Sequence, residues 1–252
     1  MADNPFEHAR EFLKDNVRQR VDFSSTEQNR GVPAPPLEKP FPADAVRIDL
    51  PKGNNPGQLG TMSVGEAIAN RESRRNYAET PLTLNELSFL LWASQGIRIR
   101  LDRGHALRTV PSAGCRHAFE TYLCVLNVEG VAPGIYRFLP LEHQLLLVAG
   151  PDRLDLRIGR AALGQMWAGD AAVVFVWSVL PCRMEWRYGM AAHKVIALDA
   201  GHVCQNLYLA CEAIGAGTCA IAAYDQEAMD RLIGVDGKEE FTIYLAPVGR
   251  IR

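Results

Sequence analysis

Apolar residues recur along the chain with two different periods, and each period predicts a different kind of element. The stretch 171–180 is apolar on both faces, as expected of a strand in the middle of a sheet. Two other strand-like stretches, 134–140 and 144–150, are separated by a short turn, which predicts a β-hairpin. We therefore expect a largely antiparallel sheet. The remaining strand-like stretches are 120–128 and 241–249.

Helical periodicity marks several segments between the strands, and two of these helices carry a capping signature at the N-terminus. A Ser or Thr three residues before a Glu can exchange hydrogen bonds with the first helical turn. In the second of these helices, Leu82 before the N-cap and Leu87 inside the helix can pack together as a hydrophobic staple, and Gly96 marks the C-terminal end. The two capping boxes are Ser63 with Glu66 and Thr83 with Glu86.

Two further helices are predicted towards the C-terminus. One is a long helical segment that ends near Gly215, and the other covers 225–232. Together with the strands they indicate one α+β domain, in which helices flank a central, largely antiparallel sheet. We place the limits of this domain at 61–252.

Residues 1–60 form an N-terminal arm in this interpretation. A helix is predicted over 5–17, and the segment 31–42 is rich in proline, which favours extended backbone and cannot build a core alone. A short strand and a turn follow at 47–57. We expect the arm to lie along the main domain or along a partner subunit.

Charge and hydropathy narrow the class of protein. The net charge of −2 at pH 7 favours neither a nucleic acid nor an anionic membrane as a partner. The apolar run 171–180 has half the length of a membrane helix, so no membrane span is expected. The N-terminus lacks the apolar stretch of a signal peptide, and we therefore expect a cytoplasmic protein.

The six cysteines form no C-x-x-C pair and are interpreted as buried thiols. Cys124 and Cys211 fall at apolar positions of periodic segments. His193, His202 and Cys204 lie close together in the sequence, but their spacing is not that of a zinc signature. No metal site is expected.

The segment 71–77, RESRRNY, places three arginines around one serine. Cations at a helix end complement the macrodipole, which accounts for one or two of them by a few tenths of a kcal/mol each. A phosphate accounts for the serine and the third arginine as well, because guanidinium forks and a hydroxyl match its oxygens. If the helix continues this far, Arg71 and Arg75 share one face and Arg74 points elsewhere. The segment alone leaves both interpretations open.

Two more segments are candidates for ligand contact. The stretch 108–122 contains Pro-Ser-Ala-Gly, whose small or rigid residues let backbone approach a flat ligand, although it also reads as an ordinary loop. The stretch 212–226 is rich in glycine and alanine. It follows a helix rather than a strand, so we reject a dinucleotide fingerprint there and expect backbone N–H groups facing a ring edge.

In their order along the chain, these segments resemble the nitroreductase family of FMN-dependent oxidoreductases. The matching pieces include RESRRNY, LTLNELSFLLWASQGI, RTVPSAG, WRYG, LDAGHVCQNLYLACEAIGAGTCAIAAYD and YLAPVGR, from about residue 63 to the C-terminus. The closest resemblance is to the subgroup with the azoline dehydrogenases of thiazole/oxazole-modified peptide biosynthesis. The resemblance implies a nitroreductase-like fold and an interlocked homodimer with FMN at its interface.

By position in the family motifs, the resemblance implies a set of FMN contacts. Arginines and a serine hold the phosphate and ribityl chain, the Pro-Ser-Ala-Gly loop packs on the isoalloxazine from the second subunit, and an alanine N–H faces flavin N5. In that order they are Arg71, Ser73 and Arg75 with Arg250 from the chain end; Pro111, Ser112, Ala113 and Gly114; and Ala222 and Ala223.

The chain departs from the azoline dehydrogenases at the substrate side. Arg187 and Tyr188 stand where those enzymes have a Lys-Tyr pair, and His117 stands where a tyrosine is usual. An arginine stays protonated near neutral pH and cannot act as a base, which weakens azoline oxidation as the reaction. We take Arg187, Tyr188 and His117 as candidates for the substrate side; Tyr188 and Trp186 also fit plain interface packing.

The function implied is an NAD(P)H-dependent reductase of a small organic acceptor, a nitro compound or a quinone, with ping-pong kinetics. A first alternative is a flavin-dependent dehydrogenase of a peptide-like or azoline substrate that passes electrons to oxygen. A second alternative is a flavin- or cofactor-binding protein without turnover.

Overall fold

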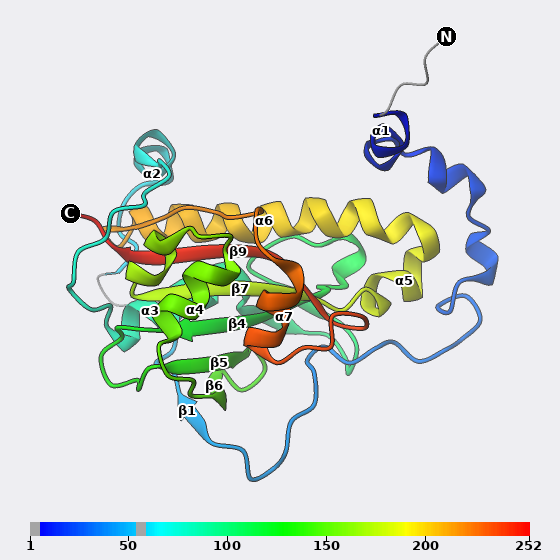
Figure 1. Ribbon diagram of the computed structural model, residues 1–252. Helices are drawn as coiled ribbons and strands as arrows, with labels where there is room; N and C mark the ends of the chain where they lie inside the picture. Colours follow the sequence, from blue (N-terminus) through cyan, green and yellow to red (C-terminus); the bar gives the residue numbers. More distant parts are fainter. Residues whose placement is uncertain (1–5, 54–58) are drawn as a thin grey trace.

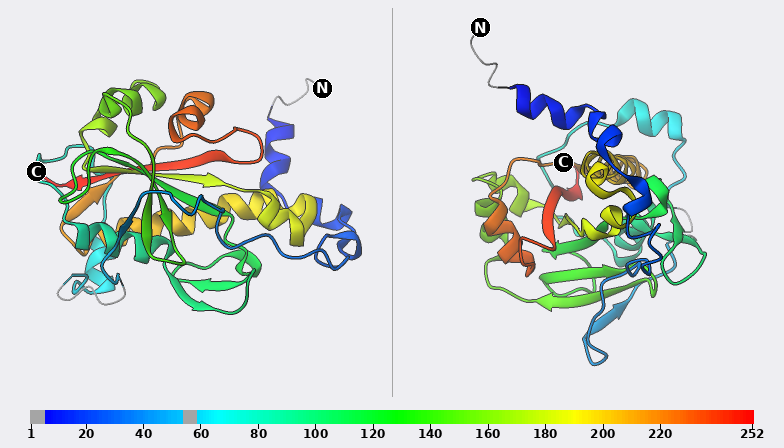
Figure 2. Two further views of the ribbon diagram at one scale, coloured as in Figure 1. Left: turned by 90° about the horizontal axis from the view of Figure 1, so that it is seen from below. Right: turned by 90° about the vertical axis from the view of Figure 1, so that its right-hand side faces the viewer.

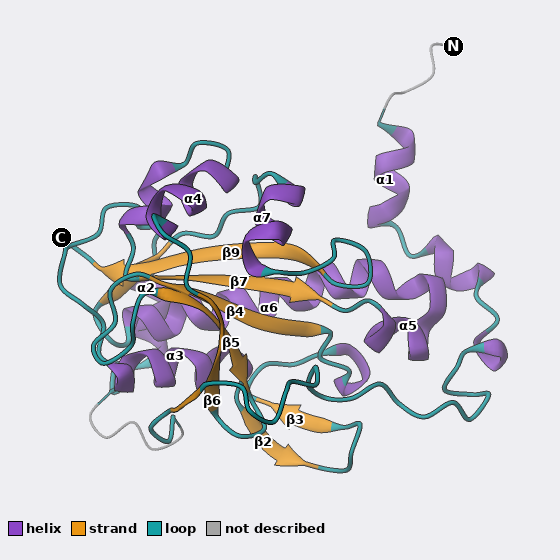
Figure 3. Ribbon diagram, turned by 60° about the horizontal axis from the view of Figure 1, so that its bottom comes forward, coloured by secondary structure: helices purple, strands orange, loops and turns teal. Residues whose placement is uncertain are grey.

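A seven-stranded antiparallel sheet forms the centre of the computed structural model, which describes residues 6–53 and 59–252 (Figure 1). Every neighbouring pair in the order β1-β6-β5-β4-β7-β9-β8 is antiparallel. A separate hairpin pairs β2 with β3 beside the sheet (Figure 3). The strands are β1 (Arg47–Asp49), β2 (Ile97–Arg100), β3 (Ala106–Arg108), β4 (Phe119–Val125), β5 (Gly134–Leu139), β6 (Gln144–Ala149), β7 (Val173–Val179), β8 (Ala216–Thr218) and β9 (Phe241–Arg250).

Helices cover both faces of the sheet, which gives three layers (Figure 2). Helices α3 and α6 pack on one face, and α4 and α7 pack on the other. Residues of β7 contribute alternately to the two cores, with Phe175 and Trp177 on one side and Val174 and Val176 on the other. The helices are α1 (Glu7–Leu13), α2 (Val64–Asn70), α3 (Leu84–Gln95), α4 (Leu154–Ala161), α5 (Cys182–Tyr188), α6 (Ala192–Glu212) and α7 (Gln226–Ile233).

The predicted α+β class, the hairpin and the doubly covered strand are confirmed. The hairpin is β5–β6, and the stretch 171–180 contains β7, which is buried throughout between β4 and β9. Both capping boxes are present, with Ser63 and Thr83 each bonded to the backbone N–H three residues later. Leu82 and Leu87 are fully buried in the same core, as the staple requires. The prediction that the six cysteines are buried thiols holds for Cys124, Cys204, Cys211 and Cys219, but it is wrong for Cys115, which is half-buried, and for Cys182, which is exposed.

Gly96 ends α3 for a reason other than a left-handed turn. Its backbone is extended, with φ of −61° and ψ of 142°. A Cβ added there would lie 2.5 Å from Trp92 Cδ1 and 2.6 Å from the Trp92 carbonyl oxygen. The glycine is therefore required by the close approach of the Trp92 side chain and backbone.

Several elements were not predicted from the sequence. They are the β2–β3 hairpin, β8, α4, α5 and the short 3₁₀ helices η1 (Asn16–Arg20), η2 (Phe23–Ser25), η3 (Ala113–Cys115), η4 (Met166–Asp170) and η5 (Gly189–Ala191). The first helix is shorter than predicted and gives way to η1. The turn expected after β1 has its centre at 54–57, outside the described residues.

The N-terminal arm takes two different courses. Helix α1 stands away from the sheet and its flanking helices, and Phe12 and Leu13 are more than half exposed (Figure 1). From Thr26 to Pro40 the chain lies along the main domain of its own subunit and bonds to it repeatedly. The first of the two predicted courses is thus confirmed for this part of the arm.

Candidate functional site

Helix α2 ends at Asn70, and the segment 71–77 that follows it is not helical. The expectation that a helix carries Arg71 and Arg75 on one face is therefore wrong in its premise. The segment lies beside the strand residue Thr218, which accepts a hydrogen bond of 2.9 Å from the Arg74 N–H. Arg71 and Ser73 both contact one residue of α6, whereas the stem of Arg74 packs on Gly217.

Tyr208 of α6 connects the first two of these residues. The Arg71 guanidinium lies over the Tyr208 ring, 5.5 Å from its centre, and the Ser73 hydroxyl lies 3.1 Å from the Tyr208 hydroxyl. That hydroxyl also accepts a hydrogen bond of 2.8 Å from the Ala220 N–H. One tyrosine thus fixes the arginine segment relative to the loop that follows β8. Tyr208 was missed in the sequence because it lies 131 or more positions from the segment that it supports.

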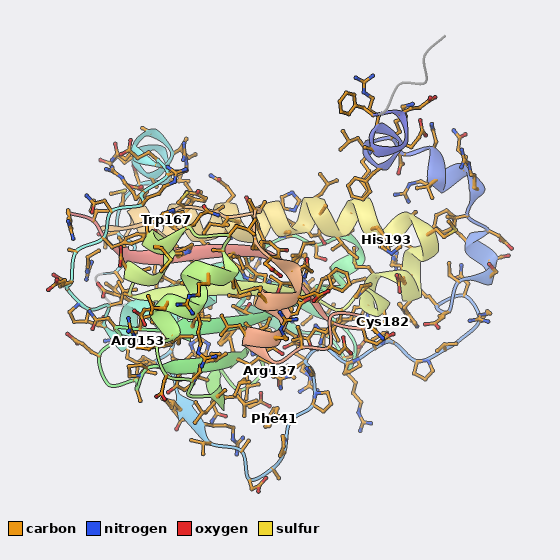
Figure 4. All side chains as sticks on the ribbon, viewed as in Figure 1. Phe41, Arg137, Arg153, Trp167, Cys182 and His193 are labelled. Atoms are coloured by element: carbon orange, nitrogen blue, oxygen red, sulfur yellow. The ribbon has the colours of Figure 1, made fainter. Side chains whose placement is uncertain are left out.

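Arg75 and Arg74 have different surroundings. Arg75 lies 5.8 Å from the centre of the ring of Trp167, a residue of η4 that is labelled in Figure 4. In the described part of the chain neither Arg71 nor Arg75 donates a side-chain hydrogen bond. Arg74 pairs with Glu72 at 2.5 Å, and its stem packs on Gly217, where a Cβ would lie 2.6 Å away.

Arg250 is already engaged within its own subunit. Its guanidinium pairs with Glu86, the capping residue of α3, and donates to the Ile214 carbonyl at 2.6 Å. Arg250 lies at the same end of the molecule as the arginine segment, because its carbonyl accepts a hydrogen bond of 2.8 Å from the Ala78 N–H. Its charge is shared with Glu86, unlike that of Arg71 or Arg75.

Ala222 and Ala223 lie in an exposed loop after β8. Ile221 before them exchanges backbone hydrogen bonds with Leu245, and Gln165 donates to the Ala223 carbonyl at 2.9 Å. Within the described residues no hydrogen bond occupies the N–H of Ala222 or of Ala223. The loop is thus fixed on both sides while its two N–H groups remain available to a ligand.

The Pro-Ser-Ala-Gly loop is held by a buried carboxylate of α6. Asp199 is 3% exposed and accepts from the Ala113 N–H at 3.2 Å. The Ser112 hydroxyl in turn accepts from the His117 N–H at 3.0 Å. Burial raises the pKa of Asp199, and hydrogen bonds from Ser112 and Ala113 oppose that shift. Asp199, which was also missed in the sequence, therefore sets the path of the loop.

Gly114 brings this loop against the end of α5. Its φ is 59°, and a Cβ added there would lie 2.7 Å from both Arg187 Cδ and the Tyr188 hydroxyl oxygen. The Arg187 guanidinium lies 5.5 Å from the centre of the Tyr188 ring and donates to Gln28 Oε1 at 3.2 Å. Three segments distant in sequence, the Gly114 loop, the end of α5 and the arm at Gln28, thus meet at Arg187 and Tyr188.

His117 and Trp186 lie inside the subunit beside this edge. His117 is 4% exposed, and burial lowers its pKa to about 3, with the Arg108 charge adding to the shift. Its imidazole is therefore neutral near pH 7. Trp186 is buried too, donates to the Val32 carbonyl at 2.8 Å and lies under Arg116, so it packs against the arm of its own subunit.

The two groups of site residues lie at opposite ends of α6 (Figure 1). Tyr208 and the arginine segment lie near its C-terminal end, whereas Arg187 and Tyr188 immediately precede its N-terminal end. From Ala192 to Tyr208 the helix rises about 24 Å. In one chain the phosphate-binding candidates and the substrate-side candidates are thus well separated.

These residues fit a flavin mononucleotide. Two guanidiniums without hydrogen-bond acceptors beside a serine hydroxyl suit a terminal phosphate, and two free backbone N–H groups suit a ring nitrogen. No group of three metal-ligating side chains occurs in the described residues. His193 pairs with Glu185 at 2.9 Å, and His202 lies 3.7 Å from Asp199. No helix in the described ranges is long and apolar enough to cross a membrane.

Comparisons with known proteins agree on one family. The sequence model of the nitroreductase family matches residues 68–250. The Methanocaldococcus jannaschii protein MJ1384, which carries a nitroreductase name, is 31% identical over 211 residues, covering 82% of this chain and 98% of that protein.

Solved structures share the fold. A longer chain from Anabaena variabilis, also named as a nitroreductase, superposes with a TM-score of 0.66 at 22% identity, covering 83% of this chain but 42% of its own length. A chain of the E. coli microcin synthetase McbBCD complex, solved with truncated pro-MccB17 bound, has a TM-score of 0.59 at 19% identity. It covers 100% of this chain and 99% of its own.

Proposed function

The chain belongs to the nitroreductase family and is an oxidoreductase, and we propose that it uses FMN to reduce a small organic acceptor, a nitro compound or a quinone, with electrons from NAD(P)H. The observation that carries the proposal is that Arg71 and Arg75, two residues before and two after Ser73, donate no side-chain hydrogen bond within the described residues. Bound FMN supplies hydride transfer in two half-reactions, with NAD(P)H and the acceptor using the same site in turn.

The chain's own residues bind and orient the cofactor. Arg71, Ser73 and Arg75 hold the phosphate and ribityl chain, while Arg250, paired with Glu86, adds positive charge at the same end. An N–H of Ala222 or Ala223 donates to the flavin ring edge. Such a fixed backbone donor stabilises charge that develops during hydride transfer, at no cost in reorganisation.

The other half of the site comes from a second copy of the chain in this proposal. Pro111, Ser112, Ala113 and Gly114 pack on the ring from the partner subunit. The separation of the two residue groups along α6 supports this arrangement, because a flavin held at one end of the helix lies far from Arg187 and Tyr188 of the same chain. We therefore propose a homodimer with two equivalent sites.

Arg187 and Tyr188 form the edge that the second substrate meets. Arg187 supplies a fixed positive charge, and Tyr188 supplies a hydroxyl next to Gly114. His117, which is neutral and buried, supports the loop through its backbone bond to Ser112 rather than by exchanging a proton. No strong base is required at this edge for hydride delivery from a nicotinamide.

A second candidate function is oxidation of a peptide-like or azoline substrate. It is favoured by one observation, the fold match to a chain of the McbBCD complex over the whole length, arm included. In that reaction Tyr188 is the residue available to take the proton, since Arg187 remains protonated.

Purified protein tests these functions directly. We expect a yellow protein with about one FMN per subunit, bleached anaerobically by NADH or NADPH and recoloured by a quinone or a nitroaromatic compound. Bleaching by an azoline peptide, but not by either nicotinamide, would replace the reductase with the dehydrogenase. Bound FMN that neither substrate bleaches would leave a binding protein without turnover, and a colourless protein that rejects added FMN would refute all three.

A further inference from the structure

A cavity of about 490 Å³ lies between the N-terminal arm and the end of α5. Arg20, Glu27 and Arg30 line it from the arm, and Glu185, Gly189 and Met190 line it from α5 and η5. Figure 4 shows Cys182 and His193, which lie beside this wall, at the end of the molecule where the arm passes α5. Its volume is within the range of small-molecule sites, about 300–1,000 Å³.

Five charged side chains line this cavity, two guanidiniums and three carboxylates. Arg20 and Arg30 make no side-chain hydrogen bond or ion pair within the part of the chain that the structure describes. Two of the carboxylates on the wall are engaged: Asp22 accepts from the N–H and the hydroxyl of Ser24, and Glu185 pairs with His193. Glu27 is the remaining carboxylate, so two unpaired guanidiniums face one unpaired acid.

The cavity adjoins the proposed substrate edge directly. Gly189 and Met190, on its wall, follow Tyr188 in the chain. On the arm side Gln28 lies between Glu27 and Arg30, accepts from Arg187 at 3.2 Å and donates its own N–H to the Trp186 carbonyl at 2.9 Å. On each wall, a residue that lines the cavity is therefore the chain neighbour of a residue at the proposed substrate edge: Gly189 follows Tyr188, and Glu27 precedes Gln28.

We propose that this cavity binds the anionic end of an elongated substrate whose reactive end lies at Arg187 and Tyr188. The proposal rests on the proposed function for the position of the reactive end. Guanidinium forks bind oxyanions, so the group is a carboxylate of the acceptor or a phosphate of the nicotinamide dinucleotide. The arm residues that bind it precede the region 68–250 that the family shares.

The test is equilibrium binding to the FMN-loaded protein, which does not depend on turnover. Calorimetric titrations compare two matched pairs of ligands: NADPH with NADH, and a quinone carrying a carboxylate with its methyl ester. The variants are Arg20→Ala, Arg30→Ala and the double change. Arg18→Ala is the matched control, because Arg18 lies on the same segment but outside the cavity and pairs with Asp15.

In the double variant we expect the preference for one anionic ligand over its matched partner to fall about five- to tenfold, the worth of partly exposed charged contacts. Arg18→Ala keeps the wild-type preference. A fall for NADPH over NADH identifies the dinucleotide phosphate, and a fall for the acid over the ester identifies the acceptor.

Wild-type preferences for both pairs in the double variant would overturn the inference, whether or not the protein oxidises NAD(P)H. Failure of NAD(P)H to bleach the flavin would instead refute the reductase function and leave the binding result standing. Circular dichroism and FMN content of each variant exclude loss of fold as the cause of a changed preference.

Discussion

The two ends of α6 are built in opposite ways. At the C-terminal end, a single short segment supplies Arg71, Ser73 and Arg75, and their side chains are largely open to ligand. At the N-terminal end, Gln28, Gly114 and the end of α5 come together from distant parts of the chain over buried charges. The proposed cofactor site is thus encoded by one short segment, whereas the proposed substrate edge forms only when the fold brings distant segments together.

The energetic consequences of a substitution differ in the same way. The substrate end rests on Arg183 and Glu120, which pair at 2.5 Å and are each about 2% exposed. A buried ion is costly to leave without its partner, while an exposed arginine can be removed at little cost in stability. Substitutions at the Arg183–Glu120 end should therefore lower the free energy of unfolding. Substitutions in the arginine segment should weaken FMN binding instead.

The largest expected effect is on stability at the substrate end. Glu120→Ala leaves Arg183 buried without its carboxylate and removes the acceptor for the Lys39 N–H at 2.9 Å. We expect a loss of about 3–5 kcal/mol in the free energy of unfolding, measured by denaturant titration. Glu120→Gln keeps an acceptor oxygen and should lose less. A loss below about 1 kcal/mol in Glu120→Ala would remove the basis of the comparison.

The next effect concerns cofactor affinity at the other end. Arg71→Ala and Arg75→Ala should each weaken FMN binding about ten- to a hundredfold, since a charge-assisted hydrogen bond contributes about 1.5–3 kcal/mol. Arg74→Ala is the matched control, because Arg74 pairs with Glu72 and packs on Gly217. Fluorescence titration of the apoprotein measures the affinities. Equal losses in all three variants would show that the cluster acts only through its total charge.

Two buried groups, Glu38 and His117, should make the stability of the protein depend on pH. Burial raises the pKa of Glu38, in the arm, from 4.5 to about 8, with Glu142 and Glu120 adding to the shift and the Leu141 N–H opposing it. The folded protein then keeps a proton that the unfolded chain has released, so stability present at low pH is lost as pH rises towards 8. His117 acts in the opposite sense, but only below its unfolded pKa of 6.5.

Between pH 6.5 and 8 we therefore expect the wild type to lose on the order of 1 kcal/mol of stability, seen as a lower melting temperature. Glu38→Gln carries no titrating group there and should remove most of that slope. A slope that is the same in the variant and the wild type would show that Glu38 is not the titrating group.

The smallest expected effect is at Tyr188. If the protein is a reductase, Tyr188→Phe should change the rate of flavin bleaching by NADPH by less than about threefold in stopped-flow measurements, because no base is needed. With an azoline substrate the same change should cost about 10²–10⁴ in rate if Tyr188 takes the proton. A large loss in the NADPH half-reaction would show that Tyr188 has a role in hydride delivery that its position does not suggest.

Sequence reasoning succeeded where the signal lies within a few residues. The capping boxes at Ser63 and Thr83, the staple of Leu82 with Leu87, and the hairpin β5–β6 depend on neighbours in the chain, and all are present. The burial of β7 on both faces was also predicted, because the stretch 171–180 is apolar on both faces.

The failures concern contacts between distant segments. Helix α2 ends at Asn70 because the following residues bond to Thr218, far along the chain. Tyr208 and Asp199 lie on a helix whose pattern predicts only burial, and their partners become visible only after folding. The proline-rich segment was expected to be unable to build a core alone, and its backbone carbonyls, which no sequence pattern marks, bond it to the main domain.

Those carbonyls limit how far the chain can be truncated from its N-terminus without loss of stability. The Val32 carbonyl accepts from Trp186 Nε1 at 2.8 Å, the Leu37 carbonyl from Arg108 at 3.1 Å and the Lys39 carbonyl from Arg137 at 2.7 Å. Trimming the chain to residues 68–250, the region that the family model matches, would remove these acceptors and leave the buried donors without partners. The smallest fragment of this chain able to fold on its own therefore includes the arm from about Thr26 onward, and a fusion partner is best joined ahead of that point.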